Sequence, residues 1–148
     1  MNTEKLITIA GVTIIIIIAL HLKNQVKKRK KMRSWIGRRQ QGRGLLNMLE
    51  TELLSEDPTA YRNFLRLNNE QFEEILSLIE NYIKKEDTLL KASVSARNRL
   101  EVTLRFLATG ETYRSLMYSC RIHESTISRF IPEVCVAIYK KLREKYLK

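Results

Sequence analysis

From residue 45 onward, the chain is a series of amphipathic segments separated by residues that start or stop helices. Apolar side chains recur every three or four residues, and no stretch of useful length alternates apolar and polar side chains as a half-buried strand would. The boundary signals are Asp57 before Pro58, Asn68, Ser95 and Gly110. The sequence therefore predicts an all-α fold, a small helical bundle of one domain.

The boundary signals divide this part of the chain into helices over residues 45–56, 58–67, 69–85 and 96–109. Within the last of these, Leu100, Leu104 and Leu107 are expected to point inward. Pro132 would remove a hydrogen bond from a helix, so we expect a joint there, followed by a final helix that starts at residue 133.

Residues 113–131 fit the apolar pattern of a helix-turn-helix, in which two short helices cross around a small apolar centre. The positions expected to point inward are all apolar: Leu116, Cys120, Ile122, Ile127 and Phe130. Two positions depart from the usual pattern, because Met117 replaces a small residue and Arg121 replaces the turn glycine. His123 takes the cap position of the second helix, and Ser125 is expected to share that role.

The outward face of this unit carries short polar side chains and arginine, which suit base edges and phosphates. The candidate DNA-binding residues are Arg114, Arg121, His123, Glu124, Ser125, Thr126, Ser128 and Arg129. Arg129 is expected to reach a guanine, and Arg114 and Arg121 the DNA backbone. The alternative is a surface ion pair for each of two arginines, Arg129 with Glu133 and Arg114 with Glu111, worth only ~0.3–0.5 kcal/mol apiece.

Charge is distributed unevenly along the chain, whose net charge is +11. Residues 23–44 carry +10, residues 45–90 carry −6 and residues 91–148 carry +7. Two basic regions of this kind favour a polyanion partner, here double-stranded DNA. The first also resembles a nuclear localisation signal or a phosphate-binding arm, with candidate residues Lys27, Lys28, Arg29, Lys30, Lys31, Arg38 and Arg39.

An uncharged apolar run, "LITIAGVTIIIIIAL", fills residues 6–20 and is extended to seventeen residues by His21 and Leu22. That length borders on the ~17–20 residues that a spanning helix needs, and the basic flank would put the C-terminal side in the cytosol. Three interpretations stay open: a membrane anchor, a leader of a soluble nuclear protein, or a buried element of the fold. The predicted organisation is an apolar segment (1–22), a basic linker (23–44) and a helical domain (45–148).

No side-chain set in the sequence predicts catalysis, a metal site or a cofactor. Cys120 and Cys135 lie on helical segments and are expected to be small core residues in a reducing compartment. The carboxylates are expected to be solvated or helix-capping groups, with no pair facing inward.

Two stretches, "DPTAYRNFLRLNNEQFEEIL" and "LEVTLRFLATGETYRSLMYSCRIHESTISRFIPEVCVAIYKKL", resemble the N-terminal part of PIF/Harbinger-type transposases and the nucleases derived from them. The similarity covers roughly residues 50–148. It implies a helical DNA-binding region in the nucleus and a Myb-like companion protein. The family's metal-dependent Asp, Asp, Glu nuclease domain would follow this region, so none of its catalytic residues can be placed on this chain.

The resemblance and the basic charge together predict a DNA-binding protein truncated before the nuclease domain and without activity of its own. The alternative is a single-pass membrane protein whose helical domain faces the cytosol and binds other proteins. A nuclease active on its own is a third, weaker alternative, because no inward carboxylate pair is expected.

Overall fold

The computed structural model describes residues 14–16, 33–86 and 93–146, and the chain divides into two compact units, Met1–Met32 and Arg33–Lys148. In the first unit only Ile14, Ile15 and Ile16 are described; they are helical and exposed. The rest of the predicted apolar run and the cations of residues 27–31 lie outside the described residues. Among the residues that are described, no helix combines the length and the apolar character that crossing a bilayer requires.

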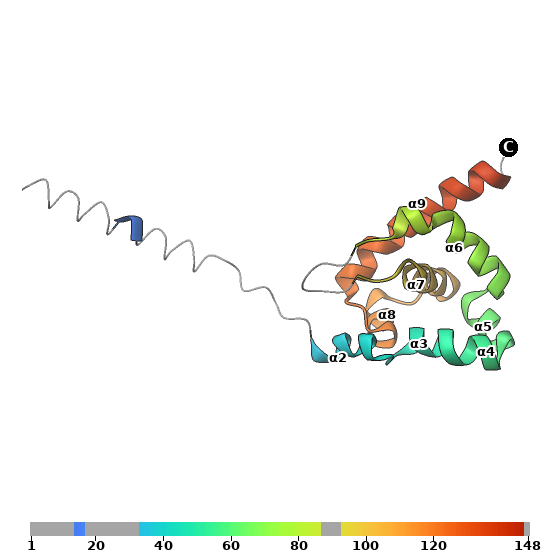
Figure 1. Cartoon of the computed structure of the whole chain (residues 1–148), viewed down its shortest axis with the longest axis horizontal. Helices are drawn as coiled ribbons and strands as arrows, with labels where there is room; N and C mark the ends of the chain where they lie inside the picture. The colour runs from blue at the N-terminus through green and yellow to red at the C-terminus, as the bar shows by residue number, and fades with distance from the viewer. Residues whose placement is uncertain (1–13, 17–32, 87–92, 147–148) are drawn as a thin grey trace, which may run out of the picture. The chain divides into compact units, whose positions relative to one another are not determined.

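The second unit is built of helices, and its described residues contain no strand, which confirms the all-α prediction. Figure 1 shows their arrangement. In chain order the elements are α2 (Ser34–Gly37), the 3-10 turn η1 (Arg38–Gln41), α3 (Leu45–Met48), the π-helical segment η2 (Leu49–Leu53), α4 (Leu54–Glu56), α5 (Pro58–Leu65), α6 (Asn69–Ile83), α7 (Ala96–Thr109), α8 (Tyr113–Cys120) and α9 (Glu124–Tyr146).

The boundary signals in the sequence act as predicted. Asp57, Asn68 and Ser95 each cap a helix, since a side-chain oxygen accepts the backbone N–H three residues on at 2.8–3.2 Å. Gln71 completes a capping box by accepting the backbone N–H of Asn68 at 3.1 Å. Gly110 ends α7 in the left-handed conformation, with φ 67°.

Helix α7 is the centre of the unit, where it packs against α5, α6, α8 and α9 (Figure 1). Leu100 and Val102 of α7 have no exposed surface. Because α7 is covered on several sides, its buried residues also include the polar Arg99, Glu101 and Thr103, and the usual division into one apolar and one polar face breaks down. Burying the apolar side chains supplies the main favourable term of the fold.

The folded unit starts earlier than the domain boundary expected at residue 45. Ile36 is buried in the core, and Trp35 is half-buried against it. Residues 33–44, assigned to the basic linker from their charge, therefore belong to the helical unit. The linker was predicted from charge, because this stretch contains four arginines and only two large apolar side chains, Trp35 and Ile36.

The joint predicted at Pro132 is wrong, because α9 runs uninterrupted through this residue. Proline leaves the carbonyl of Ser128 without its helical N–H partner. Pro132 and Ser128 are both exposed, so water can reach that carbonyl and the lost hydrogen bond costs less than it would in the core. The recognition helix and the last helix are therefore one helix.

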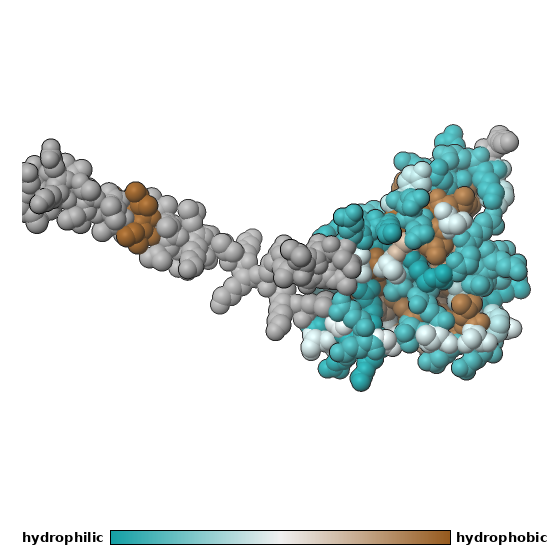
Figure 2. All heavy atoms as spheres, in the orientation of Figure 1, coloured by the Kyte–Doolittle hydropathy of each residue, from teal (hydrophilic) through white to brown (hydrophobic). Residues whose placement is uncertain are grey.

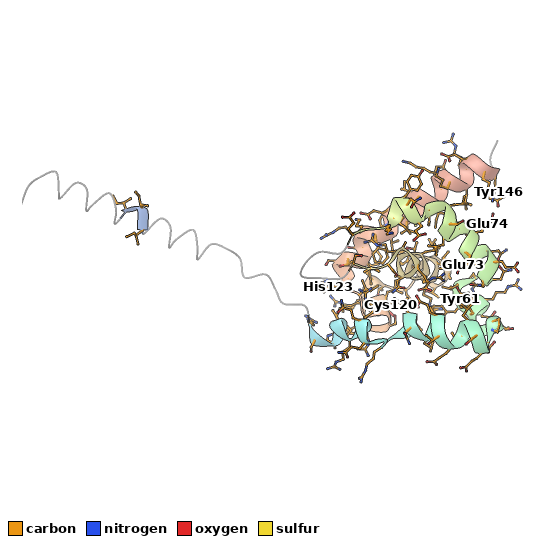
Figure 3. All side chains as sticks on the ribbon, in the orientation of Figure 1. Tyr61, Glu73, Glu74, Cys120, His123 and Tyr146 are labelled. Atoms are coloured by element: carbon orange, nitrogen blue, oxygen red, sulfur yellow. The ribbon has the colours of Figure 1, made fainter. Side chains whose placement is uncertain are left out.

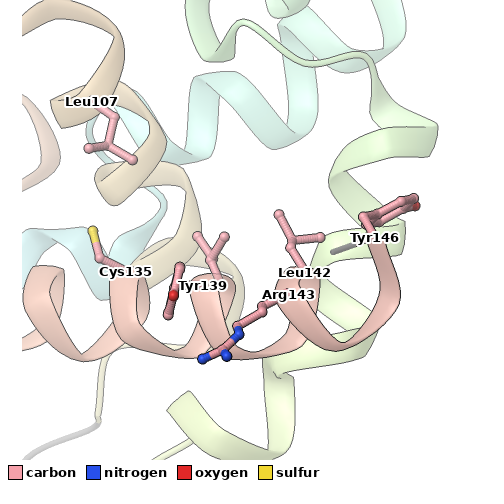
Figure 4. A pocket seen from close by; sticks show the side chains of 7 residues that line it. Leu107, Cys135, Tyr139, Leu142, Arg143 and Tyr146 are labelled. Atoms are coloured by element: carbon pink, nitrogen blue, oxygen red, sulfur yellow. The ribbon is translucent and has the colours of Figure 1, made fainter. Parts of the chain in front are cut away.

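The inward orientation predicted for Leu107 is also wrong, since 59% of its surface is exposed. It lies at the rim of a hollow of about 500 Å³ beside α9 (Figure 4). We call this hollow the apolar groove; its other lining residues are Cys135, Ile138, Tyr139, Leu142, Arg143 and Tyr146. Figure 2 shows how such apolar patches interrupt an otherwise mainly hydrophilic surface.

Glu101 departs from the expectation that the carboxylates are solvated or capping groups. Its side chain on α7 is 1% exposed, and neither carboxylate oxygen has a hydrogen-bond partner among the described residues. Burial, helped by the nearby charge of Glu50 and opposed by that of Arg97, raises the pKa of Glu101 to about 8. Tyr61, labelled in Figure 3, is buried too, and burial raises the pKa of its phenol to about 12.

The raised pKa of Glu101 makes the stability of the fold dependent on pH. The folded protein holds this carboxyl protonated up to about pH 8, whereas the unfolded chain releases the proton near its ordinary value. Below the ordinary pKa of a glutamate, the protonation of Glu101 therefore does not lower the free energy of unfolding. Above that pKa, the free energy of unfolding falls by about 1.4 kcal/mol per pH unit until the pH reaches the pKa of Glu101 in the folded protein. We expect Glu101→Gln to stabilise the protein by about 2–3 kcal/mol more at pH 9 than at pH 6.

Urea unfolding of both proteins at the two pH values measures this difference. The control is Glu80→Gln, at an exposed carboxylate of α6, whose effect on stability should not change between the two pH values. An equal effect of Glu101→Gln at both pH values would contradict the assigned pKa.

Candidate nucleic-acid interface

Helix α8 and the residues after it have the local geometry of a helix-turn-helix. Thr112 caps α8 by accepting the backbone N–H of Ser115 at 3.2 Å. After α8 the chain turns at Arg121, which adopts the left-handed conformation with φ 53° and ψ 41°. This is the turn position that usually holds glycine, so the arginine keeps the backbone conformation although it lacks the conformational freedom of glycine.

The inner side of the unit is packed as predicted. All five positions expected to point inward have at most 3% of their surface exposed: Leu116, Cys120, Ile122, Ile127 and Phe130. Met117, at the position where a small residue is usual, is also buried. Helices α8 and α9 pack on each other and on α7, so the central helix supports both.

Cys120 and the half-buried Cys135 are both free thiols. Burial raises the pKa of Cys120 to about 11, which makes this thiol unreactive.

His123 caps α9 as predicted, whereas the hydroxyl of Ser125 contacts the ring of His123 and no backbone N–H among the described residues. The backbone carbonyl of His123 accepts the N–H of Ile127 at 3.1 Å. Its Nδ1 lies 3.2 Å from the backbone nitrogen of Ser125, which donates to it, and 2.8 Å from the Oγ of the same residue. A ring nitrogen that accepts an N–H carries no proton, so this contact assigns the proton to Nε2. The Nε2–H of the exposed imidazole (Figure 3) donates to no group in the part of the chain that the structure describes.

The outer side of the first two turns of α9 is open to solvent. Ser125, Ser128 and Arg129 are exposed, and Glu124 and Thr126 are half-buried. No described residue forms a hydrogen bond or ion pair with the guanidinium of Arg129. Its five N–H donors are therefore free for a ligand, in the planar arrangement that matches two adjacent acceptors.

Neither of the alternative ion pairs predicted for this region forms between the described residues. Glu133 lies 3.0 Å from Lys85 and 3.5 Å from the buried guanidinium of Arg99, so it is not available to Arg129. Arg114 pairs with Glu124 at 3.4 Å instead of with Glu111. This pair places a cation beside the acid at the start of α9 and offsets part of its negative charge.

The remaining candidate residues differ in exposure. Arg121 is half-buried, and its Nη1 donates to the backbone carbonyl of Trp35 at 2.9 Å. Arg38 is exposed, whereas Arg39 is half-buried, and burial lowers the pKa of its guanidinium. The sequence pattern missed the contact to Trp35, because it joins residues 86 positions apart.

Fold and site together define an all-α protein that presents an exposed, partly basic face on the second helix of a helix-turn-helix. A comparison with known protein families, curated proteins and solved structures found no match. The resemblance to Harbinger-type transposases stays a prediction from the sequence motifs.

The two faces of α9 predict effects of very different size on stability for two neighbouring substitutions. Ile127→Ala removes a fully buried side chain beside α7 and should destabilise the protein by about 2–5 kcal/mol. Arg129→Ala truncates an exposed side chain that pairs with no described residue, and it should change stability by less than about 0.5 kcal/mol. Urea unfolding of the two variants distinguishes these effects, and comparable destabilisation by both would contradict the assigned faces.

Proposed function

We propose that the chain binds double-stranded DNA by placing the first two turns of α9 in the major groove. The observation that carries this proposal is the exposed polar face of α9, with Arg129 unpaired among the described residues, on a helix whose opposite face is fully packed. A recognition helix needs both properties, because the packed face fixes its position and the open face meets the bases.

Each exposed group has a role that suits its chemistry. Arg129 can donate two parallel hydrogen bonds to O6 and N7 of a guanine, the commonest specific contact in the major groove. The Nε2–H of His123 is a donor for a phosphate oxygen or a base edge. The hydroxyl oxygens of Ser125 and Ser128 can accept from the amino group of a base, because their hydrogens are directed at Nδ1 of His123 and at the carbonyl of Ser125.

The charge distribution supports a nucleic-acid partner. Residues 23–44 and 91–148 carry +10 and +7, and these charges would attract duplex DNA over a longer range than the contacts of α9. The proposal places the protein in the nucleus and gives it no catalytic activity of its own. A Myb-like companion protein is a further proposal that rests on the family resemblance alone.

Binding to duplex DNA at several salt concentrations tests the proposal. We expect affinity to fall steeply with salt, by about one logarithmic unit per tenfold rise in salt for each phosphate contacted. Arg129→Ala should weaken binding to a preferred sequence by about 1–3 kcal/mol and leave binding to random DNA nearly unchanged. A flat salt dependence of the wild type would refute the proposal.

The second candidate is a membrane-anchored protein whose helical unit binds another protein. The apolar groove favours this second candidate, because all its lining residues except Arg143 are apolar or aromatic. Such a lining suits an amphipathic helix of a partner protein that places an acidic side chain near Arg143. The anchor itself would be the apolar run of residues 6–22, most of which lies outside the described residues. Carbonate extraction of membranes from cells expressing the full chain tests this candidate, and release of the chain would exclude a spanning anchor.

A further inference from the structure

Residues 33–44, here called the basic arm, lie against the turn of the helix-turn-helix. We infer that the basic arm is a second phosphate-binding element, held at a fixed offset from the recognition helix by Arg121. In this arrangement Arg121 is a positioning residue and makes no DNA contact. The inference deepens the proposed function and rests on it for the identity of the ligand.

The first observation is the direction of the Arg121 side chain. Its Nη1 donates to the backbone carbonyl of Trp35 at 2.9 Å, so its hydrogen bonding is directed at the basic arm. This contact explains why an arginine occupies a left-handed turn position at which glycine would be less strained. The cost in backbone conformation is offset by a charge-assisted hydrogen bond that glycine cannot form.

The second observation is the packing of Trp35. Its indole stacks on the ring of Tyr118 of α8, with ring centroids 5.8 Å apart and an angle of 17° between the ring planes. Tyr118 stays 63% exposed with the indole stacked on it, so the basic arm covers only one part of this ring. The neighbouring Ile36 is buried in the core and anchors the same turn.

The third observation is the close approach at the other end of the basic arm. Gly44 has φ 119°, and a Cβ there would lie 3.2 Å from Cδ of Arg121 and 3.3 Å from the carbonyl oxygen of Ser119. A larger residue at this position would be strained and would push against the backbone of α8. The basic arm therefore contacts α8 and the turn at both of its ends.

The consequence is a set of exposed cations on an arm that is held against α8 and the turn before α9. Arg33, Arg38 and Arg43 are exposed and form no ion pair with any described residue. In Figure 1, α2 and the first turn of α9 lie at the same end of the unit, with α8 beside them. A duplex whose major groove holds α9 would bring its phosphate backbone close to this end. The partner that fits is thus a phosphate backbone.

The fluorescence of Trp35, the only tryptophan of the chain, reports whether the basic arm is docked. We expect Arg121→Gly to release the arm without straining the turn, so that the emission shifts to longer wavelength and acrylamide quenching increases. The matched control is Arg66→Gly. Arg66 is an exposed arginine that, like Arg121, follows a helix in the left-handed conformation, with φ 64°, and its replacement removes the same charge. The control should leave Trp35 unchanged.

Duplex binding of the same full-length variants tests the ligand. Loss of the contacts of the three exposed cations of the arm should lower the slope of log affinity against log salt by about 2–3 in Arg121→Gly, compared with at most about 1 in Arg66→Gly. Gly44→Ala keeps every charge and should lower the slope as well, because the added methyl group crowds Arg121 and the carbonyl of Ser119 and so separates the arm from α8.

Each other outcome overturns the inference in a distinct way. Equal quenching of Trp35 in Arg121→Gly and Arg66→Gly would show that Arg121 does not hold the basic arm. Release of Trp35 with an unchanged salt slope would show that the arm does not bind phosphate. If the wild type bound no duplex, the proposed function and the arm's ligand would fall together, while the fluorescence would still decide the docking.

Discussion

The burial of α7 by its neighbours is the constraint on which the rest of the structure depends. Helices α5, α6, α8 and α9 all pack on it, so the acidic first half and the basic second half of the unit share one core. The helix-turn-helix has no core large enough to stand alone, and its inner residues are held by this central helix. The position of the candidate DNA-binding face is therefore set by contacts on the opposite side of α9.

Local signals in the sequence were sufficient to predict much of this fold. Caps such as Asp57, Asn68 and Ser95 act through side chains three residues from their partners, so the sequence shows both members of each pair. The five inward positions of the helix-turn-helix were predictable for a similar reason, because helical spacing fixes which residues share a face. The prediction of exposed polar residues on α9 followed from the same spacing.

The features that the sequence did not predict depend on contacts between distant segments. Glu101 is buried because α7 is covered on several sides, which helical spacing within α7 alone cannot show. Arg121 points at Trp35 and not at solvent because the two segments meet only in the folded protein. Pro132 was predicted to end a helix because proline removes a backbone hydrogen bond. In the structure this lost hydrogen bond lies on the solvent side of α9, and the helix continues.

The continuity of α9 through Pro132 has a mechanical consequence. With 23 residues and a rise of about 1.5 Å each, α9 is a rod of about 35 Å with Arg129 near one end and the apolar groove along the other. An inserted residue between them would rotate one end relative to the other by about 100°. The angle between these two surfaces about the axis of α9 is thus fixed by the number of residues that separate them.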